Sequence, residues 1–180
     1  MDILPATSPL RATDARAALL AGGLSLGLLL GAWVFQYGLG YAPCVMCYWQ
    51  RHAHKAVLGV ALAVLAVRGV TGRAGGFARW LGPTLLVSAL MASVSLAVFH
   101  VGVEQGLWAG PQQCAADLGG EALSFGGDDP LAVLDQTFRG PSCADVPWRF
   151  LGLSMAGWNA LVSLLGALGV VWVSVKGARA

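Results

Sequence analysis

Residues 80–103, WLGPTLLVSALMASVSLAVFHVGV, contain no Asp, Glu, Lys or Arg. A helix of about 20 such residues crosses a lipid bilayer. Two more uncharged stretches run over residues 17–50 and 150–175. The chain of 180 residues is 57% hydrophobic and 11% charged, whereas about a quarter of the residues of a soluble domain are charged. We therefore expect lipid to be the solvent for much of this chain.

A fourth apolar run, residues 56–67, is too short to span a membrane by itself. It spans if its helix begins near Cys47, with His52, His54 and Lys55 near the lipid headgroups. A re-entrant segment is the alternative. The first apolar stretch is too long for the core of a signal peptide, about 7–15 residues, so we expect it to be retained. The prediction is a single all-α membrane domain over residues 1–180, a four-transmembrane-helix bundle with helices at 17–38, 47–67, 80–101 and 150–174.

The charged residues predict the orientation of this bundle. Four spans place both termini and the loop 68–79 on one side, and the loops 39–46 and 102–149 on the other. The first side holds seven of the eleven basic residues: Arg11, Arg16, Arg68, Arg73, Arg79, Lys176 and Arg179. The long loop between the third and fourth helices, with its flanks, holds seven of the nine acidic residues. Because basic residues mark the cytoplasmic side, both termini are predicted to be cytoplasmic and the long loop to face outward.

All four cysteines, Cys44, Cys47, Cys114 and Cys143, fall on the outward side of this topology. Disulfides persist outside the cytosol, so an even number of cysteines there indicates two disulfide pairs. Three pairings are possible, and the favoured one joins Cys44 to Cys47 and Cys114 to Cys143. Between the loop cysteines, residues 130–138 have apolar side chains at helical spacing, which fits either a short helix on the membrane surface or a plain loop.

The local pair, Cys44-Val45-Met46-Cys47, follows Pro43 where the second helix is expected to begin. The unpaired N–H groups of a helix N-terminus favour a thiolate, and Arg51 lies one turn beyond Cys47 on the same face. A disulfide inside one turn closes little chain and would stabilise little, so the pattern indicates a redox-active pair. The alternatives are an inert bridge or a zinc site with His52 or His54, although zinc sites usually lie in water-exposed knuckles. We predict no metal site.

The electron acceptor is predicted to be a quinone. No glycine-rich nucleotide-binding motif is present in the sequence, and the Cys-x-x-Cys lies at the lipid boundary, where a lipid-soluble quinone can reach it. Three aromatic residues accompany it: Tyr41, Tyr48 and Trp49. Arg51 and His100, predicted to lie at a similar depth, can donate hydrogen bonds to the carbonyl oxygens of a quinone. His100 fits equally well as a polar residue at the membrane interface.

At these residues the chain resembles the DsbB family of bacterial disulfide-bond-forming membrane proteins, from about residue 17 to 175. The most specific motifs are Pro43-Cys44-Val45-Met46-Cys47 with Gln50-Arg51, and Cys143 followed by Trp148-Arg149-Phe150-Leu151-Gly152-Leu153-Ser154-Met155 and Trp158-Asn159. His100 before Cys114 also fits. The vitamin K epoxide reductase family combines similar features, but there the loop cysteines precede the Cys-x-x-Cys.

The resemblance implies an electron relay in the bacterial inner membrane, with the cysteines facing the periplasm. A reduced periplasmic protein of the DsbA type, with a thioredoxin fold, would attack the loop disulfide at Cys114. Electrons would pass from Cys114–Cys143 to Cys44–Cys47 and then to ubiquinone, or to menaquinone as the alternative acceptor. Cys47 would face the quinone as a thiolate, with Arg51 supporting both.

Two other classes of function are weighed against this relay. A membrane scaffold whose disulfides brace an outer loop would tolerate loss of the Cys-x-x-Cys. A solute transporter would need polar groups inside its spans, where the sequence offers mainly serines, which commonly bond to their own backbone or to a neighbouring helix. The basic residues form no patch suited to nucleic acid, so we expect no nucleic-acid partner.

Overall fold

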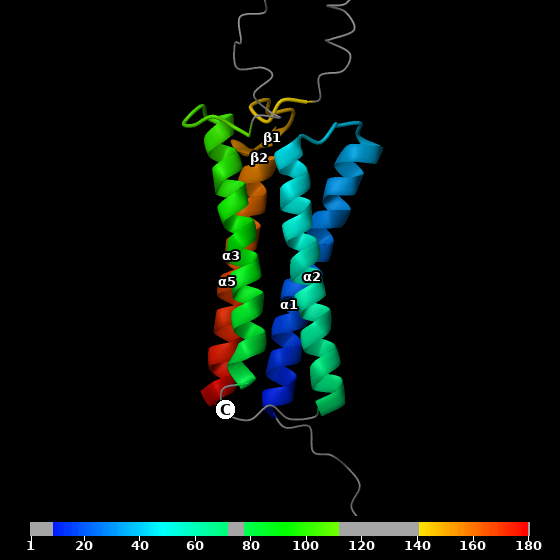
Figure 1. Cartoon of the computed structure of the whole chain (residues 1–180), viewed down its shortest axis with the longest axis vertical. Helices are drawn as coiled ribbons and strands as arrows, with labels where there is room; N and C mark the ends of the chain where they lie inside the picture. The colour runs from blue at the N-terminus through cyan, green and yellow to red at the C-terminus, as the bar shows by residue number, and fades with distance from the viewer. Residues whose placement is uncertain (1–8, 72–77, 112–140, 180) are drawn as a thin grey trace, which may run out of the picture.

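The computed structural model describes residues 9–71, 78–111 and 141–179. Within these ranges the chain forms four long helices and one short hairpin (Figure 1): α1 Pro9–Trp33, α2 Val45–Thr71, α3 Ala78–Glu104, β1 Arg149–Phe150, β2 Leu153–Ser154 and α5 Met155–Arg179. A π-helical turn, Val34–Gly38, follows α1. The four helices include segments of 23 to 26 residues that are apolar enough to cross a membrane. The predicted all-α fold with four membrane-spanning helices is confirmed.

The helices pack in the order α1, α2, α3 and α5 around the bundle, and α1 also contacts α3 across it. Figure 1 shows that α1 begins and α5 ends at the same end of the bundle, whereas the hairpin lies at the opposite end. The N-terminus of α2, the C-terminus of α3 and the start of α5 therefore meet at the hairpin end. These three segments are far apart in the sequence, and each contributes residues to the candidate site.

Small side chains allow the helices to approach closely. The buried core consists of Ala17, Ala18, Ala21, Val57, Ala61, Val64, Leu86, Leu90, Ala167 and Val170. A Cβ atom added to Gly166 of α5 would lie 2.7 Å from a methyl carbon of Leu24 in α1, so no larger residue fits without a shift. Large apolar side chains point outward instead, including Leu62, which is 65% exposed. This inside-out distribution is expected when lipid is the solvent, because close packing rather than apolar burial then holds helices together.

The helices extend further than the uncharged runs predict. The first and third begin at Pro9 and Ala78 rather than at 17 and 80, and the second and third end at Thr71 and Glu104 rather than at 67 and 101. A helix continues beyond the bilayer for as long as its residues favour it, so charged residues are included in the end turns. One of them, Arg68 of α2, forms a 2.6 Å ion pair with Asp14 of α1.

The predicted start of the last helix at 150 is wrong. Residues 149–154 form an antiparallel pair in which Phe150 lies opposite Leu153. Leu151 and Gly152 have φ values of 51° and 81°, as a two-residue hairpin of the type I′ class requires. Helix α5 begins only after Ser154, whose hydroxyl accepts a 3.1 Å hydrogen bond from the N–H of Gly157 and so caps the helix.

Candidate functional site at the hairpin end of the bundle

The two cysteines of the Cys-x-x-Cys lie at the N-terminus of α2. Cys44 is the N-cap residue: its carbonyl accepts from the N–H of Tyr48 (3.2 Å), and its sulfur accepts from the N–H of Cys47 (3.3 Å). Both cysteines are free thiols in this structure, with their Sγ atoms 2.9 Å apart. The disulfide predicted for this pair is therefore not formed here, and the geometry is that of the reduced dithiol.

The two sulfurs are not equivalent. Hydrogen bonding to the Cys47 sulfur, together with burial, raises the pKa of the Cys44 thiol well above its ordinary value. Cys44 is only 5% exposed, whereas Cys47 is half-buried. Cys44 therefore keeps its proton at neutral pH and can donate it to the Cys47 sulfur. Of the two, Cys47 is the sulfur suited to bear negative charge.

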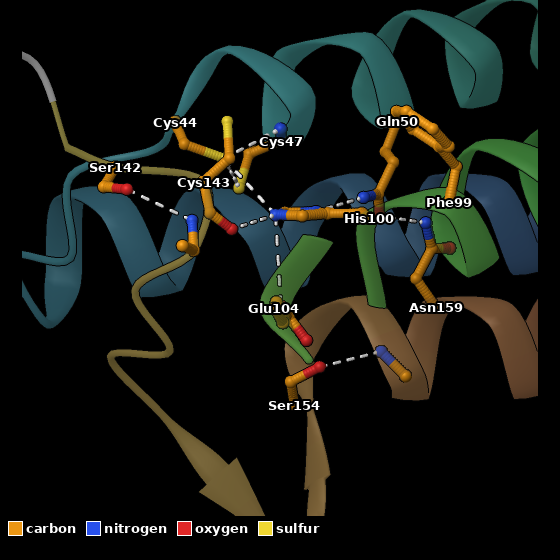
Figure 2. A network of polar contacts seen from close by, with 12 residues as sticks. Cys44, Cys47, Gln50, Phe99, His100, Glu104, Ser142, Cys143, Ser154 and Asn159 are labelled. Atoms are coloured by element: carbon orange, nitrogen blue, oxygen red, sulfur yellow. Dashed lines mark hydrogen bonds and ion pairs between the residues drawn. The ribbon is translucent and has the colours of Figure 1, made fainter. Parts of the chain in front are cut away.

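Cys143 packs beside this pair. It is completely buried and shares an apolar cluster with Cys44, Met46 and Val103. It is disulfide-bonded, while Cys114, its expected partner, lies outside the described residues, as does the segment 130–138. Figure 2 shows Cys143 next to Cys44 and Cys47, although about 100 residues separate them in the sequence.

His100, near the end of α3, connects the cysteines to the interior of the bundle. Its Nε2 lies 3.7 Å from the sulfur of Cys44 and 3.2 Å from the carbonyl oxygen of Cys143. Its Nδ1 lies 2.7 Å from Nε2 of Gln50. The amide nitrogen of Gln50 can only donate, so Nδ1 is the acceptor and the ring proton is on Nε2, facing the cysteines. The side chain of His100 is therefore held with its N–H directed at the redox pair (Figure 2).

From His100 a continuous series of hydrogen bonds enters the bundle, which we call the polar chain. Gln50 Oε1 accepts from Nδ2 of Asn159 (2.6 Å), and Asn159 Oδ1 accepts from Nε2 of His54 (2.7 Å). Three serines complete it: Ser25 and Ser93 bond to His54, and Ser163 bonds to Asn159. All members are buried and come from all four helices. In lipid such groups need internal partners, and here each has at least one.

The position of His54 corrects a sequence prediction. We expected His54 near the lipid headgroups, but it is 3% exposed and points into the bundle. His52, which was predicted to lie near the headgroups together with His54, is exposed, and its Nδ1 bonds to the carbonyl oxygen of Tyr48 (2.7 Å). Gln50, Asn159 and Glu104 also belong to the site, although sequence reasoning gave them no role. The available signal was isolated polar residues one turn from another polar group in an apolar helix: Gln50 follows Cys47, Glu104 follows His100, and Asn159 precedes Ser163.

Arg51 lies in α2 one helical turn after Cys47, as the sequence predicts. Its guanidinium donates to Gln36 Oε1 and, over 3.1 Å, to the carbonyl oxygen of Ala32. It also lies over the ring of Tyr48, 5.4 Å from the centroid. The oxygen acceptors at the end of α1 and in the π-helical turn therefore hold a permanent positive charge at membrane depth, one helical turn from Cys47.

A cavity of about 500 Å³ connects these groups. Cys44, Cys47, Arg51 and His100 line it, as do the inner polar residues Gln50, His54 and Asn159. Because it reaches from the dithiol to the polar chain, a molecule in it would contact the Cys-x-x-Cys and hydrogen-bonding groups together.

An aromatic wall borders the same cavity. Phe35 lies 6.0 Å from Tyr41 and 5.0 Å from Trp148 between ring centroids, and Phe150 lies 6.0 Å from Trp148 and 6.1 Å from Trp158. All except Phe150 line the cavity. The wall suits a flat apolar ring.

Of the three aromatic residues expected at the quinone site, only one lines the cavity. Tyr41 lines the cavity, whereas Tyr48 and Trp49, both within the described part of the chain, are 44% and 39% exposed and lie outside its lining. Both are among the first five residues of α2.

Comparison with known proteins identifies relatives over almost the whole chain. Residues 14–173 match a family model described as disulfide bond formation protein DsbB. A disulfide bond formation protein B of Azoarcus sp. (strain BH72) is 36% identical over 159 residues, 87% of this chain and 84% of that protein. Another, of Xanthomonas euvesicatoria pv. vesicatoria (strain 85-10), is 32% identical over 168 residues, 91% of this chain and 92% of that protein.

Proposed function

Because this chain belongs to the DsbB family of disulfide bond formation proteins, we propose that it reoxidises a periplasmic dithiol protein and passes the electrons to a membrane quinone. As a family member it is a multi-pass membrane protein that takes part in thiol oxidation. The proposed partner is a DsbA-type protein with a thioredoxin fold, and the proposed acceptor is ubiquinone, with menaquinone as the alternative. The catalytic cysteines are Cys44, Cys47, Cys114 and Cys143.

The packing of Cys143 against Cys44 supports a direct exchange between the two pairs. After the partner has attacked the loop disulfide at Cys114, Cys143 is released as a thiolate. It attacks the sulfur of Cys44 in an oxidised Cys44–Cys47 pair, forming a Cys143–Cys44 bond while the Cys44–Cys47 bond breaks. Cys47 leaves as the thiolate. The Nε2–H of His100, 3.7 Å from the Cys44 sulfur, can stabilise negative charge on the sulfurs during this exchange.

The cavity has the properties that a quinone headgroup requires. It combines an aromatic wall with hydrogen-bonding groups next to Cys47. Arg51 would hold one carbonyl oxygen by a charge-assisted hydrogen bond, and His100 lines the same cavity. A bound quinone supplies the acceptor for the two electrons of the dithiol and takes up two protons. The chain contributes the binding groups.

The orientation is also a proposal. We infer that the hairpin end faces the periplasm of a bacterial inner membrane, with both termini in the cytoplasm. The basic residues at the opposite end support this, including Arg68, Lys176 and Arg179. Every described cysteine lies at the hairpin end, which is where disulfides would persist.

The observation that supports the proposal most strongly is that one cavity joins the reduced Cys44–Cys47 dithiol to Arg51 and the aromatic wall. The test uses purified full-length protein in detergent with a reduced DsbA-type partner, and follows ubiquinone reduction by absorbance. We expect activity in the parent, loss in Cys47→Ala, and no change in Ser95→Ala. Ser95 is exposed and bonds to the carbonyl oxygen of Met91 in its own helix.

A parallel series with menaquinone separates the choice of acceptor from the existence of the reaction. Activity with either quinone, abolished by Cys47→Ala, supports the relay. Absence of activity with both would overturn it and favour a scaffold whose disulfides brace the outer loops.

A further inference from the structure

Three potential metal ligands meet at the hairpin end of the cavity. The sulfurs of Cys44 and Cys47 and a ring nitrogen of His100 all lie within 4.8 Å of one another. Thiolate and imidazole are the ligands that zinc prefers in proteins. The arrangement exists because the structure has the cysteines as thiols, and it would be lost in a disulfide.

Glu104 provides a fourth group at the same place. Its Oε1 lies 3.9 Å from Nε2 of His100, and its side chain is 5% exposed. Among the described residues, Glu104 Oε2 is a buried side-chain oxygen with no hydrogen-bond partner. The Ser154 hydroxyl, which accepts from the N–H of Gly157 (Figure 2), and the positive charge of Arg149 both lie near this carboxylate and favour its charged form, although neither is bonded to Oε2. A buried carboxylate oxygen without a partner is unfavourable, so a cation here would satisfy an unmet interaction.

The separations among the sulfurs and His100, and between His100 and Glu104, are close to those of a tetrahedral site, whereas the Glu104 carboxylate lies outside the 4.8 Å group and must rotate towards the sulfurs to join it. Zinc bond lengths place two tetrahedral sulfurs about 3.8 Å apart, sulfur and nitrogen about 3.6 Å, and nitrogen and oxygen about 3.4 Å. The observed separations are 2.9 Å between the sulfurs, 3.7 Å from Cys44 to His100, and 3.9 Å from His100 to Glu104. Each differs from the ideal by about 1 Å or less, which side-chain rotations can supply.

We propose that the reduced form of this chain binds one thiophilic divalent cation of the zinc type through Cys44, Cys47, His100 and Glu104. The two sulfurs bind as thiolates, so their two protons are released, and no electrons are transferred. The cavity that all four residues line provides the path by which the ion reaches them. The oxidised pair has no thiolate to offer, so binding is confined to the reduced state. A bound ion holds the dithiol reduced and blocks its oxidation by any acceptor.

The surroundings of His100 are suited to this role. To bind a cation, Nε2 must present its lone pair and the ring proton must move to Nδ1. Gln50 can accept that proton in a hydrogen bond if its amide group turns over together with that of Asn159, so that Asn159 Oδ1 accepts from Gln50 and Asn159 Nδ2 donates to Nε2 of His54, whose ring proton moves to Nδ1. A hydrogen-bond acceptor that orients the second nitrogen of a ligating histidine is a common feature of zinc sites.

The site can be tested without partner or quinone, so its failure is distinct from failure of the proposed function. The purified chain is reduced with a phosphine under anaerobic conditions and titrated with Co²⁺. Tetrahedral cobalt–thiolate coordination gives visible absorption bands and an ultraviolet charge-transfer band. We expect these bands to saturate at one Co²⁺ per chain, to be displaced by Zn²⁺, and to be absent from oxidised protein.

Variants assign the ligands. A Cys114→Ser/Cys143→Ser background removes the other thiols and should retain the spectrum. In that background, Cys47→Ser should abolish it, and Glu104→Gln should weaken Co²⁺ binding at least tenfold. His52→Ala is the matched control, because this histidine is exposed and bonds to its own helix, and it should bind as the parent does.

Three outcomes would overturn the site. The first is the lack of a tetrahedral spectrum in the reduced parent. The second is loss of the spectrum when only the loop thiols are removed. The third is unchanged affinity in both Glu104→Gln and His100→Ala. Each variant is compared after gel filtration in detergent, and the isosteric Glu104→Gln serves if His100→Ala does not fold.

Discussion

The polar chain should stabilise the bundle as a unit, and replacing His54 and Asn159 by leucine tests this. Asn159→Leu removes the partner of Gln50 Oε1, now at 2.6 Å, and one of the two partners of His54 Nε2, now at 2.7 Å, which keeps Ser93. An orphaned buried group costs about 1–3 kcal/mol, whereas an interhelical hydrogen bond in a membrane contributes about 0.6 kcal/mol on average. With two interhelical bonds lost, we expect a decrease of about 1–3 kcal/mol in the free energy of unfolding.

The double variant is more informative than either single variant. His54→Leu alone leaves Asn159 and two serines with fewer partners, and we expect a loss of similar size. In the double variant the two leucines replace both members of a hydrogen-bonded pair. We expect a coupling free energy of about 0.6–1.7 kcal/mol, so that the double variant is less destabilised than the sum of the singles.

The measurement is unfolding by SDS in mixed micelles, followed by tryptophan fluorescence, for the parent, both single variants and the double variant. Ser95→Ala, at an exposed serine, should change stability by less than about 0.5 kcal/mol. Effects that add within about 0.3 kcal/mol would refute the claim that these residues act together.

Three further results are expected. Iodoacetamide at neutral pH should modify Cys47 in the reduced chain before Cys44, because Cys44 is buried and its pKa is raised by the Cys47 sulfur and by burial; mass spectrometry of timed samples that found Cys44 modified first would contradict this. The ring of Trp108 stacks on Phe99, with 5.7 Å between the centroids. Gly102→Ala should displace this ring, since the new Cβ would lie 1.9 Å from it. The loss of the stacked pair should cost about 0.5–1.5 kcal/mol, with a fluorescence change that is absent in a Trp108→Leu background. Arg51→Lys keeps the charge but loses the planar group that donates to two acceptors, so the KM for quinone should rise about tenfold, equivalent to about 1.4 kcal/mol, and an unchanged KM would exclude Arg51 from quinone binding.

The membrane fold was predictable because its signal is spread over many residues. Each span is marked by some twenty apolar positions, so an error at one of them changes nothing. The start of α5 was not predictable from hydropathy, because Phe150, Leu151 and Leu153 are apolar in a hairpin as well as in a helix. A local signal did exist in Leu151-Gly152, which suits a tight turn, and in Ser154, which suits a helix cap.

The site was predictable only where its chemistry is rare. Four cysteines in the predicted loops of one side stand out, and so does an arginine one turn after a Cys-x-x-Cys. His54 and Asn159 are single polar residues more than one hundred positions apart, and nothing local says that they meet. Their pairing depends on how α2 and α5 are rotated in the bundle, which is set by the packing of small residues such as Gly166 against Leu24.

The cap of α2 affects how substitutions at Cys44 must be interpreted. Its sulfur is both a redox atom and the acceptor for the N–H of Cys47. Alanine at this position would remove the thiol and also the cap, and loss of a cap costs about 0.5–2 kcal/mol. Serine would remove the redox chemistry while its hydroxyl still accepts that N–H. An inactive Cys44→Ala protein therefore combines a chemical defect with a frayed helix, and only the serine variant separates the two.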